Sequence, residues 1–461
     1  MSERAPVAHA EGDDSTTRWR SDGYGLFIER RGDTLHHYEV TAISCVRSLT
    51  SIRQSSRGDT IRFVAPSTNG DLGGVEDAFD LQPGPSPDRQ WMSVDGAISR
   101  IGLIRDTQRP ARCDSTAAAD PRATYAVFWH TWHEHYPFFT LKRIDWNAVD
   151  RAHRSRIDST TTPRALFEHF REMIAPFTDA HTFIHATTLD IGYGGGRPLP
   201  SGYARNADSL IRHVIATRYL TQGLRPMLNG QMEIGRLAAD IPYVRLTSFA
   251  EYARDPRFAV QLDSLETALD TLLVDADRWR GLVIDVRQNG GGSDVFGTVI
   301  AGRLADRDYV AYDKVIRNDT TVESARTAPQ RAMVVRSPRR RFTGPVVLLT
   351  GIESVSAAET FAMALMGRQP AVTRIGEHTQ GVFSDVLTRR LPNGWMFGLP
   401  NEIYLTTTGV AYDGPGVPPD ITVPVFRTSD VRAGRDPAIE RALRMLAASA
   451  ADSLSGAARR P

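Results

Sequence analysis

The chain has few cysteines and no long apolar run. Cys45 and Cys113 are its only two cysteines in 461 residues, which excludes a cysteine-ligated metal or a dense disulfide framework. These two could still form one bridge in an oxidising compartment. No apolar run reaches the ~18 residues needed to cross a bilayer, and the first residues lack the apolar core of a signal peptide. We therefore expect a soluble protein with no integral membrane segment.

Lysine and net charge are also scarce. The 55 basic residues are nearly balanced by 54 acidic ones, for a net charge of +1, so no overall field favours nucleic acid or anionic lipid as a partner. Only Lys142 and Lys314 are lysines, so almost all of the positive charge comes from arginine. This shortage narrows the choice of a catalytic base.

Length and composition indicate two to four structural units. Short β-rich runs separated by turn signals follow a polar start, and a mixed α/β pattern dominates the second half. The predicted units are a disordered arm (1–17), a small all-β domain (18–108), a linker (109–119), a helical lead-in (120–180), an α/β core (181–426) and a C-terminal helix and tail (427–461).

The lead-in contains an aromatic stripe and three closely spaced histidines. Aromatic residues recur at three- and four-residue intervals, which predicts one buried helix face: Tyr125, Trp129, Trp132, Tyr136 and Phe139. His130, His133 and His135 lie in the same stretch but lack a partner at the spacing of a helical zinc motif. We therefore predict a packed helix, with no metal site and no cofactor.

The stretch "VVLLTGIESVSAAETFAMALM" predicts a buried strand followed by a helix that begins near Ser356. Ser356 would then lie at the carboxyl edge of a parallel sheet, where ligands bind and a helix dipole favours a developing negative charge. Serine is also a preferred helix cap, so this position alone does not identify a nucleophile.

A second strand, "GLVIDV", leads into three consecutive glycines, Gly290 to Gly292. Consecutive glycines let the backbone approach a ligand and direct N–H groups toward it. The segment matches neither a phosphate-binding loop nor a dinucleotide-binding fingerprint. A glycine loop beside a helix-capping serine is the arrangement that acyl transfer requires.

Four segments in order, "GLVIDVRQNGGG", "GIESVSAAETFAMAL", "RIGEHTQG" and "GVAYDGPGVPPDITV", resemble the tail-specific, or C-terminal-processing, serine peptidases. The lead-in stretches "YAVFWHTWHEHYPFF" and "MIAPFTDAHTFI" are similar to the tricorn-core-like branch. The resemblance covers roughly residues 120 to 426. It implies an α/β catalytic domain of ClpP/crotonase-like type, preceded by the helical lead-in and the N-terminal all-β domain.

By this resemblance Ser356 is the nucleophile, and Ser354 occupies the tight turn before it. The oxyanion hole would combine the N–H of Ala357 with one from Gly291 or its neighbour Gly290. Many family members use a lysine base about 25 residues after the serine, but Val382 stands at that position here. The resemblance therefore implies the histidine-type mechanism.

His181, in "DAHTFI", matches the base of the histidine-type branch and can accept a proton at neutral pH. Asp413, in "YDGPG", is the predicted carboxylate that orients it, although the family often has the longer glutamate. Glu377 and Glu359 are alternative carboxylates, although the helix dipole already explains Glu359 in the first turn of the serine's helix. His185 and His378 are alternative bases. About 60 residues separate His181 from Tyr243, too few for the PDZ module of ~80 to 100 residues that lysine-type members insert.

We thus expect a serine endopeptidase that acts on short peptides or unfolded proteins. Two alternatives remain open: a non-catalytic ligand-binding protein, because the scaffold also occurs in retinoid-binding proteins, and an acyl-thioester enzyme of the crotonase type. The resemblance implies a periplasmic or secreted location, while the absence of an export signal leaves a cytoplasmic one open. The natural substrate and the oligomeric state do not follow from the sequence.

Overall fold

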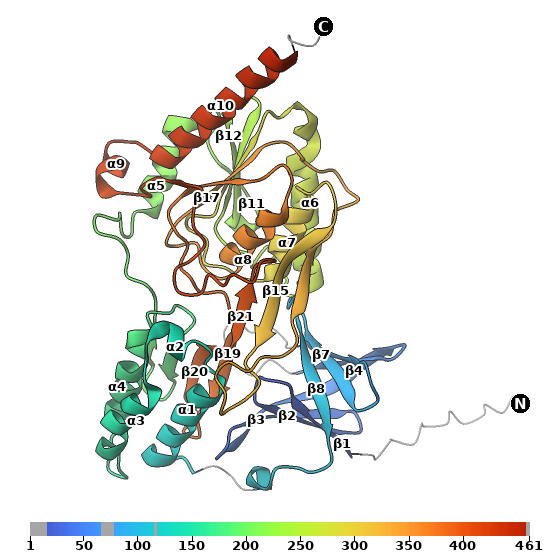
Figure 1. The fold of residues 1–461 in the computed structure, drawn as a ribbon, viewed down its shortest axis with the longest axis vertical. Helices are drawn as coiled ribbons and strands as arrows, with labels where there is room; N and C mark the ends of the chain where they lie inside the picture. The colour runs from blue at the N-terminus through green and yellow to red at the C-terminus, as the bar shows by residue number, and fades with distance from the viewer. Residues whose placement is uncertain (1–15, 66–77, 115–117, 458–461) are drawn as a thin grey trace, which may run out of the picture.

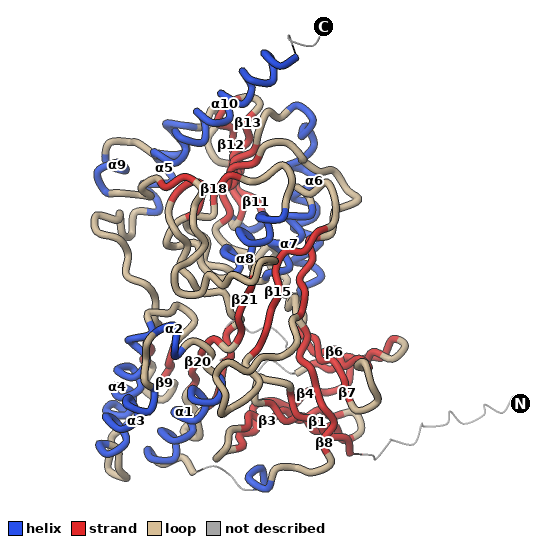
Figure 2. Tube along the Cα trace, in the orientation of Figure 1, coloured by secondary structure: helices blue, strands red, loops and turns tan. Residues whose placement is uncertain are grey.

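The structure is a computed structural model that describes residues 16–65, 78–114 and 118–457. Figure 1 shows a β-barrel and a group of helices at one end of the molecule and an α/β part at the other. The predicted arm (1–17) lies outside the described residues as far as Ser15, as does the predicted linker (109–119) over residues 115–117. The strands lie mainly in the barrel and along the middle of the molecule (Figure 2).

The N-terminal all-β domain is a closed antiparallel barrel in which β1 pairs with β8. Its strands are β1 (Thr16–Ser21), β2 (Leu26–Arg31), β3 (Thr34–Val40), β4 (Cys45–Arg57), β5 (Thr60–Val64), β6 (Ala78–Pro83), β7 (Arg89–Val94) and β8 (Arg100–Asp106). Leu35, Phe63 and Leu103 are fully buried in its interior, because side chains alternate between the two faces of a strand. This confirms the expected N-terminal all-β domain.

The two cysteines form a disulfide. Cys45 begins β4, and Cys113 lies in the short helix η1 (Ala111–Asp114) that follows the barrel. The bridge therefore fixes the segment that leaves the barrel against its fourth strand.

The lead-in forms four helices, α1 (Pro121–His135), α2 (Phe139–Lys142), α3 (Trp146–His153) and α4 (Pro163–Ile174). Asp120 caps α1, accepting hydrogen bonds from the backbone of Arg122 and Ala123, with Pro121 at the first helical position. All five residues of the predicted aromatic stripe are buried. They do not form one helix face, because α1 ends at His135, so that Tyr136 caps it and Phe139 begins α2.

A four-stranded antiparallel sheet packs against these helices in the order β10-β9-β20-β19. Its strands are β9 (Phe183–Ala186), β10 (Ile191–Gly194), β19 (Val386–Arg390) and β20 (Met396–Pro400). Phe128 of α1 contacts Phe397 of β20, with ring centroids 4.9 Å apart. Helices and sheet share one hydrophobic core, so packing continues across the boundary expected at residue 181.

The α/β core is built on a seven-stranded sheet in the order β11-β12-β13-β14-β17-β18-β22. The strands are β11 (Arg225–Met227), β12 (Met232–Ala238), β13 (Ile241–Leu246), β14 (Leu282–Asp285), β17 (Val346–Thr350), β18 (Thr373–Gly376) and β22 (Ile421–Thr422). β13 to β22 run parallel. β14 and β17 are central and fully buried, as their continuous apolar sequences predict.

Helices cover both faces of this sheet (Figure 1). Ile284 packs with α6 (Phe258–Leu272), α7 (Asp294–Gly302) and α8 (Ala357–Ala364), whereas its neighbour Val283 packs with α5 (Asp208–Val214) and α10 (Pro437–Ala457). The remaining short elements are η2 (Arg154–Arg156), η3 (Ala175–Phe177), η4 (Ile215–Tyr219), η5 (Leu228–Gly230), η6 (Leu273–Arg278), η7 (Leu365–Gly367) and α9 (Thr428–Arg432). Within the described ranges, no helix combines the length and apolar character needed to cross a bilayer.

A third sheet links the two ends of the molecule. It comprises β15 (Tyr309–Ile316), β16 (Gln330–Val334) and β21 (Glu402–Leu405), in the order β16-β15-β21. Figure 1 shows β15 and β21 running from the α/β part toward the barrel and the helices. The hydroxyl of Tyr24 in the barrel donates to Glu402 of β21 at 2.7 Å, so the barrel is bonded directly to this sheet.

Candidate active site

Ser356 lies between a buried strand and a buried helix. β17 ends at Thr350, and Ser356 is the N-cap residue of α8. Its backbone has φ 57° and ψ −119°, a conformation that costs a non-glycine residue about 1–3 kcal/mol. A strained strand-to-helix turn is typical of serine nucleophiles, because it presents the hydroxyl above the sheet edge.

Ser354 is engaged within the same turn. Its buried hydroxyl donates to the carbonyl of Val286 at 2.7 Å and accepts from the N–H of Gly351 at 3.1 Å. These two bonds join the turn to the end of β14. They account for Ser354 without a role in chemistry.

The glycine loop touches Ser356. A Cβ atom added to Gly291 would lie 2.7 Å from the Cβ of Ser356 and 2.9 Å from the carbonyl oxygen of Val355. Gly291 also has φ 95°, which side-chain-bearing residues rarely adopt. Only glycine at this position allows the loop to approach the serine so closely, whereas a Cβ on Gly290 would meet nothing within 4 Å.

The backbone donors of the loop already have acceptors. The N–H of Gly291 donates to Asn289 Oδ1 at 2.9 Å, and that of Gly290 donates to the carbonyl of Thr247 at 3.3 Å. Ala357 begins α8, where backbone N–H groups lack partners inside the helix. Of the three predicted oxyanion donors, Gly290 and Gly291 already donate to other acceptors, whereas the N–H of Ala357 has no acceptor within its helix.

Glu359 holds the segment that faces Ser356, a role that the sequence did not reveal. Its buried carboxylate accepts from the N–H groups of Ser356, Gly381 and Val382 and from the hydroxyl of Thr379, at 2.5 to 3.1 Å. Burial raises the pKa of Glu359 to about 8, although all four donors favour the ionised form. In the sequence, a serine three residues before a glutamate gives only the signal of a helix cap.

His181 lies in the turn between η3 and β9 and is 8% exposed. Its backbone N–H donates to Asp179 Oδ1 at 2.8 Å. Burial lowers the pKa of the His181 imidazole, against the charges of Asp179 and Asp385 and a hydrogen bond to the Ser384 backbone. Its Nδ1 atom is buried without a hydrogen-bond partner among the described residues.

Asp413 lies in a turn after β21 and is 4% exposed. Its Oδ2 atom has no hydrogen-bond partner in the part of the chain that the structure describes, and the same is true of the Tyr136 hydroxyl. Burial and the charge of Asp179 raise the pKa of Asp413, and burial followed by the charges of Asp179 and Asp413 raises that of Tyr136. These groups therefore share one buried polar region with His181.

One loop connects Asp413 with Ser356. The N–H of Gly414 donates to the carbonyl of Gly381 at 2.8 Å, and the N–H of Ser356 reaches the carbonyl of Val382 at 3.2 Å. The loop at 381–382 thus contacts both the turn that carries Asp413 and the turn that carries the serine. The structure brings these two candidates to one region without a bond between them in the described residues.

The weaker candidates lie on the strand end next to this loop. Glu377 pairs with Arg427, while its Oε2 atom is buried without a partner among the described residues. His378 is exposed, with its Nδ1 3.2 Å from the carbonyl of Pro415. An arginine partner and an exposed ring explain these two residues without catalysis.

The lysine base is absent, as the sequence indicates. Val382 is buried at the position that a lysine would occupy. Lys314 is buried on β15, where its Nζ lies 2.7 Å from Asp385 and 2.9 Å from Glu402. Burial alone would lower the pKa of Lys314, but these carboxylates outweigh it and raise that pKa. Lys314 therefore stays protonated and cannot act as a base at neutral pH.

A cleft of about 850 Å³ adjoins the site. Its lining includes Ala180, Gly290 and Val355, each directly beside a candidate catalytic or oxyanion residue. Charged side chains of both signs also line it: Arg197, Asp208, Arg212, Glu233 and Arg245. This mixed lining suits a polypeptide with mixed charge.

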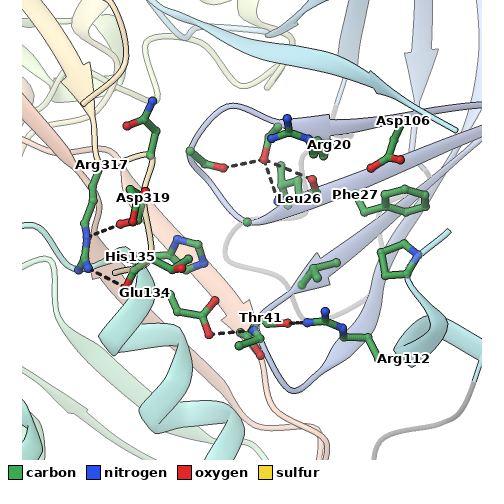
Figure 3. Close-up of a pocket in the computed structure, with 18 residues that line it drawn as sticks. Arg20, Leu26, Phe27, Thr41, Asp106, Arg112, Glu134, His135, Arg317 and Asp319 are labelled. Atoms are coloured by element: carbon green, nitrogen blue, oxygen red, sulfur yellow. Dashed lines mark hydrogen bonds between the residues drawn. The ribbon is translucent and has the colours of Figure 1, made fainter. Parts of the chain in front are cut away.

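A second cavity, of about 310 Å³, lies between the barrel and α1. Figure 3 shows Glu134, His135 and Arg317 on one side of it and Thr41 and Arg112 on the other. None of its described lining residues is a candidate for catalysis.

Two family models match this chain. Peptidase family S41 matches residues 240–423, which include Ser356, the glycine loop and Asp413. The tricorn protease C1 domain matches residues 117–175, the helical lead-in. The two matches flank His181.

Known proteins agree with these matches. The chain is 26% identical over 192 residues to a carboxy-terminal-processing protease of Bartonella bacilliformis, a match that covers 41% of this chain and 40% of that protein. A putative peptidase from Parabacteroides merdae is similar in structure, with a TM-score of 0.60, 25% identity, and coverage of 71% of this chain and 97% of that chain. Mature CPAF complexed with lactacystin has the same fold, with a TM-score of 0.51, 11% identity, and coverage of 69% and 96%. The family model, the curated relative and the fold all indicate similarity to peptidase family S41.

Proposed function

We propose that this protein is a serine endopeptidase that hydrolyses peptide bonds in peptides or unfolded proteins. The observation that carries the proposal is the contact between Gly291 and Ser356 at the strained start of α8. A glycine loop pressed against a helix-capping serine supplies the nucleophile and backbone donors together. In detail, we propose a ClpP/crotonase-like arrangement of the catalytic domain.

In this mechanism Ser356 attacks the scissile carbonyl while His181 takes the hydroxyl proton. The peptide nitrogen leaves with that proton, and water then attacks the acyl-enzyme and restores both side chains. The lowered pKa of His181 supports its role, because the neutral imidazole is the form that accepts a proton at neutral pH.

Asp413 is the proposed partner of the base. His181 Nδ1 can donate and Asp413 Oδ2 can accept, and both are buried without partners in the described residues. A buried polar atom left unpaired costs about 1–3 kcal/mol, so pairing these two would be favourable. We propose that they pair in the enzyme–substrate complex.

The proposed oxyanion hole uses Ala357 and Gly291. The Gly291 N–H now donates to Asn289, so the substrate oxyanion must compete with that neutral amide oxygen. An ionised oxygen accepts a stronger hydrogen bond than a neutral amide does. The Gly291 N–H would therefore leave Asn289 and donate to the substrate only when the charged intermediate forms.

We also propose that the enzyme works outside the cytoplasm. The Cys45–Cys113 disulfide supports this location, because such bridges persist in oxidising compartments.

The experiment that tests the proposed activity is labelling with a fluorophosphonate probe, followed by mapping of the modified residue. We expect the label on Ser356 and its loss in His181→Ala. If the wild-type protein neither takes the label nor cleaves an unfolded protein, the scaffold is a non-catalytic binding protein instead.

A further inference from the structure

Two buried histidines meet between α3 and α4. His153 is the last residue of α3, and His169 lies in α4. Their Nδ1 atoms are 3.0 Å apart and their rings are nearly perpendicular, at 89°. The two residues are only 9% and 8% exposed.

Glu172 completes a group of three. It lies one helical turn after His169 on α4, so both side chains project from the same face. One ligand atom from each of the three residues lies within 4.8 Å of the other two. Glu172 is exposed, so the group reaches the protein surface through this carboxylate.

The two imidazoles lie among charges of both signs. Burial lowers the pKa of both His153 and His169. The charge of Arg156 acts in the same direction on both rings, and that of Glu172 acts in the opposite one. With their Nδ1 atoms 3.0 Å apart, one of the two carries a hydrogen that it shares with the other.

We propose that His153, His169 and Glu172 bind a zinc ion. Two nitrogens at about 2.05 Å from a tetrahedral zinc are about 3.3 Å apart, so the Nδ1 atoms need to separate by a few tenths of an ångström and both rings need to turn so that their lone pairs converge on the ion. The shared hydrogen would pass through solvent to Nε2 of the same ring, which frees both Nδ1 lone pairs without a net change in protonation. Water takes the fourth position.

The ligand types select among metals. Two imidazoles and one carboxylate suit zinc and similar transition metals, whereas magnesium and calcium prefer oxygen ligands alone. The carboxylate also supplies a negative charge that offsets the nearby Arg156. This proposed site does not include His130, His133 or His135, the closely spaced histidines of the sequence.

The ion would join two helices of the lead-in. His153 and His169 enclose the segment that connects α3 to α4, and α4 leads through η3 to the turn that carries His181. A metal bond across this segment would resist local opening of the lead-in. The site is structural and does not depend on the proposed peptidase activity.

The test uses the full-length chain without a histidine tag, freed of metal with a chelator and titrated with cobalt and then zinc. We expect one ion per chain, with the visible absorption of tetrahedral cobalt, and displacement of cobalt by zinc. Glu172→Gln should weaken zinc binding about tenfold, and His169→Asn about 100-fold or more. His213→Ala, an exposed histidine on α5, is the matched control and should bind as the wild type does.

Glu172→Gln keeps the test decisive if removal of a buried histidine impairs folding, because Glu172 is exposed. The proposal is overturned if the wild type binds no zinc, in which case the two rings share only a hydrogen. It is also overturned if zinc binds with equal affinity to the wild type and Glu172→Gln.

Discussion

The serine side and the histidine side of the candidate site differ in how their polar groups are satisfied. Around Ser356, the carboxylate of Glu359 accepts four hydrogen bonds, and the Ser354 hydroxyl both donates and accepts. Around His181, the described residues leave His181 Nδ1, Asp413 Oδ2 and the Tyr136 hydroxyl buried without partners.

This difference follows from the origin of each side. Ser356 and Gly291 come from loops after adjacent strands of one central sheet, so the core fixes their positions. His181 precedes β9 of the four-stranded sheet and Asp413 follows β21 of the three-stranded sheet, in segments more than 200 residues apart. The first side is formed before substrate arrives, and we expect substrate to complete the second.

Replacing the nucleophile should have the largest effect. We expect Ser356→Ala to lower kcat/KM on a fluorogenic peptide by more than about 10⁴-fold, because the other hydroxyl of this turn, that of Ser354, is buried and already hydrogen-bonded to Val286 and Gly351. The variant should unfold at the same denaturant concentration as the wild type or a higher one. Alanine keeps the backbone N–H that donates to Glu359, so no bond to that carboxylate is lost. Activity within tenfold of wild type would place the nucleophile elsewhere.

Replacing the base should come next. His181→Ala removes the proposed proton acceptor, so kcat should fall about 10⁴-fold. His185→Ala, an exposed residue on β9 four positions later, is the matched control and should retain full activity. Equal losses in both variants would show that His181 and His185 matter only for the structure of this segment.

The pH profile sharpens the role of Asp413. Because burial lowers the pKa of His181, kcat/KM should be constant near neutral pH and should fall only as pH drops through that lowered value. Asp413→Asn removes the group proposed to stabilise the imidazolium in the enzyme–substrate complex, so the decline of kcat, which reports that complex, should shift to lower pH and kcat should fall about 10³-fold. An unshifted profile would assign the orienting carboxylate to another residue, such as Glu377.

The glycine loop offers a matched pair of substitutions. Gly291→Ala should lower kcat about 10²-fold, because its methyl group would collide with Ser356 and the Val355 carbonyl. Gly290→Ala, which adds a methyl group into open space, should stay close to wild type. Similar activities for the two variants would contradict a preformed serine side.

The disulfide should matter least for activity. Replacing Cys45 and Cys113 by serine should leave kcat/KM nearly unchanged, because the bridge is in neither half of the site. Loss of a bridge across 68 residues should still lower the free energy of unfolding by about 4 kcal/mol, measured by denaturant titration. A large loss of kcat would show that the barrel helps to position the histidine side.

Sequence patterns predicted the serine side well. The apolar runs at 282–286 and 346–350 could only be buried strands, and a glycine loop and a capping serine followed them directly. The barrel could be predicted as all-β, but its closure depends on the pairing of β1 with β8, which no local pattern encodes.

The rest depends on contacts between distant segments. Glu359 looked like an ordinary helix-start residue, because its donors at 379–382 are brought there only by folding. No pattern in the sequence indicates that Lys314 is buried between Asp385 and Glu402. His153 and His169 are 16 residues apart on two helices, and their spacing matches no metal motif.

The contacts between the barrel and the third sheet limit how the domains of this chain can be separated. Tyr24 covers Glu402, which pairs with buried Lys314, and Gly23 packs on Ile316. A chain shortened to begin after the barrel would expose this ion pair and an apolar strand end to water. The barrel thus covers part of the third sheet. A chimaeric protein that carries the catalytic region should therefore include the barrel as well.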